Sequence, residues 1–119
     1  MSEKDIIFTA HNKLRKITYT LYRGAPLSFG FEHIEHQRPY LTQNPHILKI
    51  GVEETDIAYW DSQHGARERI YCLGADKTRP ELYVAVIVEY ENSSHGHIIT
   101  AWQTRDLCEG DITYVKPKR

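Results

Sequence analysis

The stretch Leu82–Thr104, LYVAVIVEYENSSHGHIITAWQT, is the strongest strand signal in this sequence, and it predicts a β-hairpin. Its first arm, Leu82–Tyr90, carries apolar residues on both faces, many of them β-branched, which is typical of a central strand covered on at least one side. The polar residues 92–96 (NSSHG) supply a connection that contains glycine. Alternation along the second arm, His97–Thr104, places three side chains on one face: Ile98, Thr100 and Trp102. We expect the rest of the chain to pack on this hairpin.

Length and charge limit the classes of protein to consider. The 119 residues predict a single domain over residues 1–119 that buries a core of its own. The formal net charge is −1, so no overall positive charge points to a nucleic-acid partner, although a local basic cluster is enough to bind one. No signal peptide and no apolar stretch of membrane-spanning length is present, so we expect a cytoplasmic protein that does not enter a membrane. The two cysteines, Cys72 and Cys108, do not demand a disulfide.

The N-terminal half predicts mostly helix. Residues 5–9 suit a short strand or an extended lead-in. Residues 11–22 fit both a helical stripe and strand alternation, and we favour a helix with Asn12 as its N-cap. A further helix is expected over residues 28–38, because Pro39 cannot lie in a helix interior.

The C-terminal half predicts strands. After a short helical segment expected over His46–Tyr59, residues Arg67–Leu73 (RERIYCL) indicate a strand before the hairpin, and Ile112–Val115 can supply an edge strand. Helices followed by consecutive strands are typical of an α+β fold. We therefore predict N-terminal helices packed on a three- to four-stranded antiparallel β-meander.

Two histidines are the first candidates for chemistry. On the expected helix, His33 and His36 lie three residues apart, on neighbouring positions of one face. Histidine titrates near neutral pH and suits acid–base catalysis. Two exposed histidines on a solvated helix face explain the pattern equally well.

The strand before the hairpin carries the second set of candidates. Arg67, Arg69 and Tyr71 alternate on one face, where two guanidinium groups can bind a phosphate or carboxylate. Taken alone, the arginines are better explained by charge pairing with neighbouring carboxylates, of which there are three: Glu68, Glu81 and Glu89.

The second arm of the hairpin carries the third set. Thr100 on a central strand usually packs or bonds the backbone, but beside an exposed Trp102 it can form the floor of a site where a base stacks and a phosphate oxygen binds. A zinc site is a weaker alternative, because the four available histidines match no strong zinc motif: His33, His36, His95 and His97. We predict neither a metal nor another cofactor.

The order of these motifs resembles one family of nucleases. GFEHIEHQRPYL is followed by VEETDIAYW, RERIY, LYVAVIVEY and a strand led by glycine, GHIITAW. This succession, over about residues 28–104, is similar to the phage- and toxin-associated nucleases grouped with barnase, EndoU, the nuclease colicins and RelE. The resemblance implies a RelE- or barnase-like sheet, RNA as the substrate, and cleavage without metal by attack of the ribose 2′-hydroxyl on the adjacent phosphate.

The resemblance also implies roles for the candidate residues. His33 would act as general base or acid with support from His36, and Arg69 with Arg67 would neutralise the charge on the phosphoryl oxygens. The remaining three would bind substrate, by hydrogen bonds to phosphate or leaving oxygen or by stacking on a base: Tyr71, Thr100 and Trp102. A cognate antitoxin or immunity protein is an expected partner.

A second reading is a non-catalytic immunity-like or regulatory module that binds a protein through the same sheet face. The enzyme and the binding module are distinguished by whether the candidate residues meet in one place. A cleft shared by His33, Arg69 and Thr100 favours the enzyme, whereas arginines paired with Glu68 or Glu89 favour the binding module. A zinc-dependent hydrolase is a third reading, and it requires the histidine pairs to face one another. The sequence does not decide the RNA target or the oligomeric state.

Overall fold

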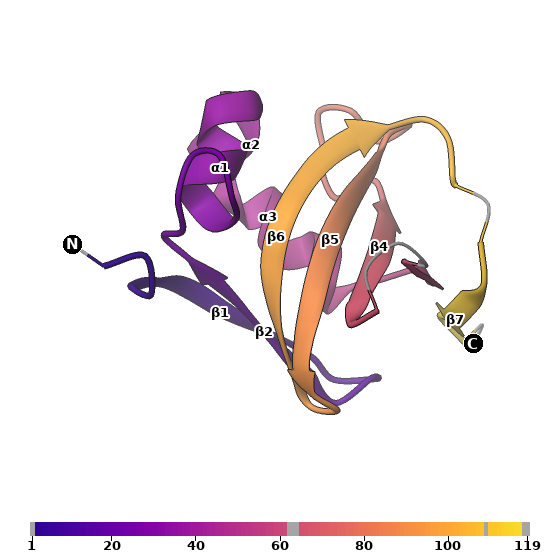
Figure 1. The fold of residues 1–119 in the computed structure, drawn as a ribbon. Helices are drawn as coiled ribbons and strands as arrows, with labels where there is room; N and C mark the ends of the chain where they lie inside the picture. The colour runs from indigo at the N-terminus through magenta and orange to yellow at the C-terminus, as the bar shows by residue number, and fades with distance from the viewer. Residues whose placement is uncertain (1, 62–64, 109, 118–119) are drawn as a thin grey trace.

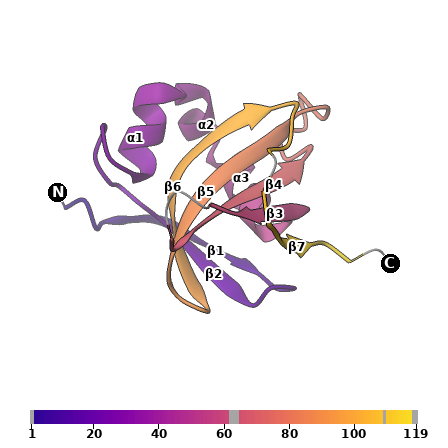
Figure 2. The ribbon, with the colours of Figure 1, turned by 45° about the vertical axis from the view of Figure 1, so that its right-hand side comes forward.

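A computed structural model describes residues 2–61, 65–108 and 110–117. Over these residues the chain forms a mixed seven-stranded sheet, in the order β1-β2-β6-β5-β4-β3-β7, with three short helices packed on one face (Figures 1 and 2). The strands are β1 (Ile6–Asn12), β2 (Ile17–Tyr22), β3 (Ile57–Trp60), β4 (Arg67–Leu73), β5 (Tyr83–Asn92), β6 (His95–Thr104) and β7 (Ile112–Val115). The helices are α1 (Gly30–Gln37), α2 (Pro39–Gln43) and α3 (Pro45–Glu53).

The predicted meander of three or four strands with N-terminal helices is wrong. Strands β3 to β6 do pair in sequence order and antiparallel, but they form only the middle of a larger sheet. The β1–β2 hairpin extends it on one side, with β2 parallel to β6, and β7 pairs with β3 on the other side. Residues 5–9, expected to be extended, do lie in or beside β1, but residues 17–22 form β2 where a helix was expected. Because β2 is parallel to β6, the sheet is mixed and not a simple meander.

The helix favoured for residues 11–22 is wrong. Asn12 does not cap a helix, since its side-chain oxygen accepts a hydrogen bond from the Arg15 N–H at 3.0 Å in a tight turn between β1 and β2. Lys16 closes this turn with a positive φ of 58°. Residues 17–22 follow strand alternation, because Ile17, Tyr19 and Leu21 are all buried in the core.

The helix expected over His46–Tyr59 is half right. Helix α3 ends at Glu53, and Ile57–Trp60 is the strand β3, which lies between β4 and β7. The hydroxyl of Thr55 donates to the carbonyls of Gly51 and Val52, which lie in the last turn of the helix. Pairing on both sides of β3 outweighs the helical spacing that its apolar residues also satisfy. The edge strand Ile112–Val115 is confirmed as β7, and the helix expected over residues 28–38 is confirmed as α1.

The central hairpin is confirmed, but one of its predicted faces is wrong. Val88 lies opposite Ile98, whereas Ile87 lies opposite Thr100, so Ile99 is an extra residue in β6. This β-bulge turns Ile98 into the helix-covered core, away from the face that carries Thr100 and Trp102. Sequence alternation cannot show a bulge, because it counts every residue of the strand equally.

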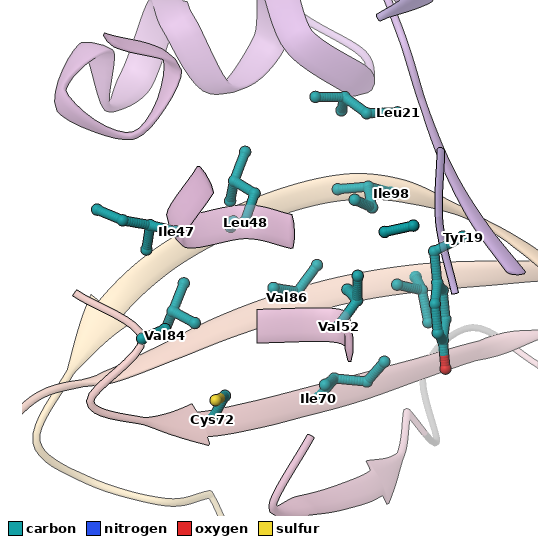
Figure 3. Close-up of a cluster of buried hydrophobic side chains, with 14 of the residues drawn as sticks. Tyr19, Leu21, Ile47, Leu48, Val52, Ile70, Cys72, Val84, Val86 and Ile98 are labelled. Atoms are coloured by element: carbon teal, nitrogen blue, oxygen red, sulfur yellow. The ribbon is translucent and has the colours of Figure 1, made fainter. Parts of the chain in front are cut away.

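The main core lies between the sheet and the helices (Figure 3). Ile47, Leu48 and Val52 of α3 pack on strand residues from β4, β5 and β6, which Figure 3 shows as Ile70, Cys72, Val84, Val86 and Ile98. Helix α3 approaches closely at Gly51, where a Cβ atom would lie 2.7 Å from a Val84 methyl carbon. A smaller cluster on the opposite face, which we call the outer face, contains Tyr59, Tyr71 and Ala85.

Candidate functional site

The structure brings the candidate residues of the strands together on the outer face. Arg69 on β4 pairs with Ile87 on β5, and Ile87 pairs with Thr100 on β6. The candidates Arg69 and Thr100 therefore lie on one line across the three strands. Tyr71 and Trp102 lie on the next line, on either side of Ala85. The predicted sharing of a face by Arg67, Arg69 and Tyr71 on β4, and by Thr100 and Trp102 on β6, is therefore observed, and the two sets lie on the same side of the sheet.

The C-terminal segment covers part of this group. Tyr71 is fully buried, and Cys108 packs beside it. Burial, and next the neighbouring Cys108 thiol, raise the pKa of Tyr71 to about 12. Gly110 lies over Arg69, since a Cβ atom there would be 3.4 Å from a guanidinium nitrogen. Tyr71 and Arg69 thus belong to a packed layer and not to an open cleft.

Two hydroxyl groups are buried in this layer. Cys108 lies beside the Tyr71 hydroxyl, whereas the Thr100 hydroxyl has no hydrogen-bond partner among the residues that the structure describes. Buried polar groups are nearly always paired, so Thr100 occupies an unusual position in the sheet. Burial keeps both hydroxyl groups away from a substrate in this conformation.

The two histidines of α1 do not join the strand candidates. The Nδ1 atom of His33 lies 2.8 Å from the carbonyl oxygen of Pro26, in the loop before the helix. His36 is exposed and lines a shallow hollow with Arg23 and Phe31. Within the described parts of the chain, no hydrogen bond or ion pair joins either histidine to the outer-face residues. Among the described residues, the recorded contact of His33 is with the Pro26 carbonyl and gives no support for a role as catalytic base.

The zinc reading loses its geometric basis as well. Over residues 2–61, 65–108 and 110–117, no three histidine, cysteine or acidic side chains gather closely enough to hold a metal ion. His33 and His36 therefore do not face His95 and His97. Both cysteines, Cys72 and Cys108, are free thiols.

A different group of charged residues lies on the outer face, near the β5–β6 turn. The Nε of Arg67 donates to a Glu89 carboxylate oxygen at 2.9 Å, and the Nε2 of His97 lies 3.8 Å from the other oxygen. Glu89 stands between them because it pairs with Arg67 across β4–β5 and with His97 across β5–β6. The Glu89 side chain is 38% exposed and remains open to solvent, while His97 is 14% exposed. Pairing of Arg67 with a neighbouring carboxylate is thus confirmed.

The surroundings of His97 favour its neutral form. Burial lowers the pKa of His97, and the positive charges of Lys4 and Arg67 lower it further. Glu89 and Glu91 act in the opposite direction, and the net pKa lies below the ordinary value for histidine. The nearby carboxylates stabilise the protonated ring and so offset part of the effect of burial on this pKa.

Neither residue stands out in the sequence. There, Glu89 is only a possible partner for the arginines, and His97 only a possible zinc ligand. The signal that could have found the pair is the hairpin itself, because residues just before and just after a short connection face each other. A carboxylate and an imidazole are both groups that can accept or donate a proton.

A separate group of charged residues is buried and has a structural role. The carboxylate of Glu68 on β4 is almost fully buried and accepts two hydrogen bonds from Arg15, at 2.7 and 3.0 Å. Tyr90 and Thr113 donate to the same carboxylate. Burial raises the pKa of Glu68, but these hydrogen bonds outweigh burial and lower it overall. The group joins the β1–β2 turn to β4, β5 and β7, and Arg15 also stacks over the ring of Tyr114.

Comparison of the chain with family models, with curated proteins and with solved structures gives no match. Among the described residues, none of the helices has the length and apolar character needed to cross a bilayer. The case for a function therefore rests on the geometry of the outer face.

Proposed function

We propose that the protein is a metal-independent endoribonuclease whose reacting groups are Glu89, His97 and Arg67. The observation that carries this proposal is the position of the Glu89 carboxylate between a guanidinium group at 2.9 Å and an imidazole nitrogen at 3.8 Å. A proton acceptor, a proton donor and a fixed positive charge are the three groups that cleavage by an internal 2′-hydroxyl requires. The proposal keeps the reaction that the family resemblance implies, but moves its acid–base residues from α1 to the β5–β6 hairpin.

The groups divide the reaction as follows. The Glu89 carboxylate accepts the proton of the ribose 2′-hydroxyl, whose oxygen attacks the adjacent phosphorus. Arg67 neutralises the charge that develops on the phosphoryl oxygens. Protonated His97 gives its proton to the departing 5′-oxygen, so the phosphorus–oxygen bond breaks. The products are a 2′,3′-cyclic phosphate and a free 5′-hydroxyl group.

The family resemblance suggests the cellular context and the partner of the proposed enzyme. It favours a toxin-like or phage-derived enzyme that acts on RNA in the cytoplasm and is held inactive by a cognate antitoxin or immunity protein. The chain has a formal net charge of −1, so attraction to RNA depends on local positive charge, which Arg67 supplies within the reacting group and Lys4 supplies beside it.

The test is incubation of the purified protein with total RNA in EDTA, beside His97→Gln. Glutamine keeps the size and polarity of the side chain but cannot transfer a proton. His33→Gln is the matched control, because it removes a histidine outside the proposed group. Cleavage by the wild type and by the control, but not by His97→Gln, supports the proposal. Equal cleavage by all three proteins contradicts it.

A non-catalytic protein-binding module remains the second candidate, and one observation favours it. Arg67 is already paired with Glu89, and Tyr71 and Arg69 lie under the segment that contains Cys108 and Gly110. A packed face of this kind suits binding of a flat protein surface. Absence of RNA cleavage at any protein concentration would favour this candidate.

A further inference from the structure

An aromatic pair lies directly beside the proposed reacting groups. The rings of Tyr22 and Phe29 both contact the His97 imidazole, with centroid distances of 5.9 and 6.0 Å. The ammonium group of Lys4 lies over both rings, 5.3 Å from the Tyr22 centroid and 5.7 Å from the Phe29 centroid. Both rings are only partly buried, and Lys4 is exposed.

Backbone contacts hold the three residues in place. The N–H groups of Arg23 and Gly24 donate to the carbonyls of Asp5 and Glu3, at 2.8 and 3.0 Å, which fixes the segment that carries Lys4. The N–H of Ala25 donates to the Phe29 carbonyl at 3.0 Å and closes the loop between the two aromatic residues.

Two glycines make this loop possible. Gly24 has a φ of +69°, and a Cβ atom there would lie 1.7 Å from the Phe29 carbonyl oxygen. Gly30 has a φ of +83°, and a Cβ atom there would lie 2.7 Å from the Tyr22 carbonyl oxygen. The tight crossing of the chain therefore requires glycine at both positions, and it is this crossing that sets Tyr22 and Phe29 side by side.

We infer that Tyr22, Phe29 and Lys4 form a subsite for one unpaired nucleobase of single-stranded RNA, next to the reacting phosphate. Neither ring is fully buried, and the residue that lies over both of them, Lys4, is exposed, so the rings lie at the protein surface. A base can take this place by stacking, while the displaced ammonium group pairs with a backbone phosphate. Bases in a duplex have no free face, so the subsite selects single strands. This inference rests on the proposed ribonuclease function for the position of the phosphate beside His97.

Binding of a short single-stranded oligonucleotide in which 2′-O-methyl groups block cleavage tests the inference separately from catalysis. Phe29→Leu and Tyr22→Leu keep apolar bulk but remove the ring, and each should weaken binding about tenfold, as loss of one base stack does. Tyr22→Phe restores a ring and should bind like the wild type. Trp60→Ala, which removes an exposed aromatic residue elsewhere, is the matched control and should also bind normally. A melting curve for each variant confirms that it is folded.

Lys4→Ala provides a second variant, because Lys4 is exposed and its removal creates no cavity in the core. It should weaken binding several-fold and reduce the dependence of binding on salt. Unchanged affinity in both leucine variants and in Lys4→Ala overturns the subsite. If those variants lose affinity while the wild type fails to cleave an unmodified RNA, the subsite stands and the proposed catalysis falls. Failure of the wild type to bind the oligonucleotide at low salt overturns both.

Discussion

Glu89 and His97 face each other across the β5–β6 pair, with 3.8 Å between a carboxylate oxygen and the imidazole Nε2. Arg67 holds the other carboxylate oxygen from β4. Three adjacent strands thus contribute one residue each to a compact group on the outer face. Because rigid paired strands carry all three residues, the group keeps its geometry without help from a loop.

Replacement of the proposed base should abolish most activity. Glu89→Gln keeps the hydrogen bonding of the side chain but cannot accept the 2′-hydroxyl proton, so kcat should fall by about 10²- to 10⁴-fold. The measurement is the initial rate of oligoribonucleotide cleavage in EDTA. Glu91→Gln is the matched control, since Glu91 lies close to His97 but is not held by Arg67. A loss of less than threefold in Glu89→Gln would argue against its role as base.

The pH profile should report the low pKa of His97. A general acid must be protonated, so activity should be high on the acidic side and fall as the pH rises through the pKa of His97. This pKa lies below the ordinary value of about 6.5, mainly because the ring is buried. Rates measured over a pH series, with histidine proton resonances followed by NMR, locate the transition.

Arg67→Ala provides the check on this assignment. The charge of Arg67 helps to lower the pKa of His97, so its removal should move the falling part of the profile to higher pH, whatever the loss in rate. A profile whose midpoint stays unchanged in Arg67→Ala would show that another group titrates.

The buried Glu68 group should control stability and not catalysis. Arg15→Met leaves the Glu68 carboxylate buried without its main partner and should lower the free energy of unfolding by about 3–5 kcal/mol. Arg15 and Glu68 are both nearly buried, with side chains 10% and 4% exposed, so solvent screens this pair little. Urea unfolding is the measurement. The double variant Arg15→Met with Glu68→Gln should recover part of the loss, and a double variant less stable than Arg15→Met would contradict the account.

Gly24 should be sensitive to a single added methyl group. Gly24→Ala places a Cβ atom against the Phe29 carbonyl and forces alanine into a positive φ. The backbone conformation alone should cost about 1–3 kcal/mol, and the clash adds to it. Thermal unfolding measures the effect. Gly65→Ala is the control, because a Cβ atom at Gly65 meets nothing within 4 Å. Equal melting temperatures for both variants would show that the loop adjusts freely.

Sequence patterns predict correctly those elements for which hydrophobic periodicity, turn residues and proline positions all favour the same structure. The β5–β6 hairpin, the β4 strand and α1 were all anticipated, because periodicity, turn residues and Pro39 point the same way. Residues 11–22 and 57–59 are predicted as helix, but the first segment forms the ends of β1 and β2 with a turn between them, and the second lies in β3. Their apolar spacing fits both periods, and only pairing with distant strands decides between them.

The candidate site was predicted in part for the same reason. Alternation placed Arg67, Arg69 and Tyr71 on one face without any knowledge of their neighbours. It could not show that Gly110 and Cys108 cover Arg69 and Tyr71, since that contact joins parts of the chain far apart in sequence. The aromatic neighbours of His97 come from the N-terminal third of the chain, so the sequence pattern around His97 could not predict them either.

Analysis of the ends produced in EDTA tests the central claim most directly. A defined oligoribonucleotide is incubated with the wild-type protein and with His97→Gln, and the fragments are identified by mass. The account predicts fragments that end in a 2′,3′-cyclic phosphate, formed by the wild type only, and no cut where a 2′-deoxy nucleotide supplies no attacking hydroxyl group. Cutting at that 2′-deoxy position, or cyclic phosphate ends produced equally by His97→Gln, would contradict it.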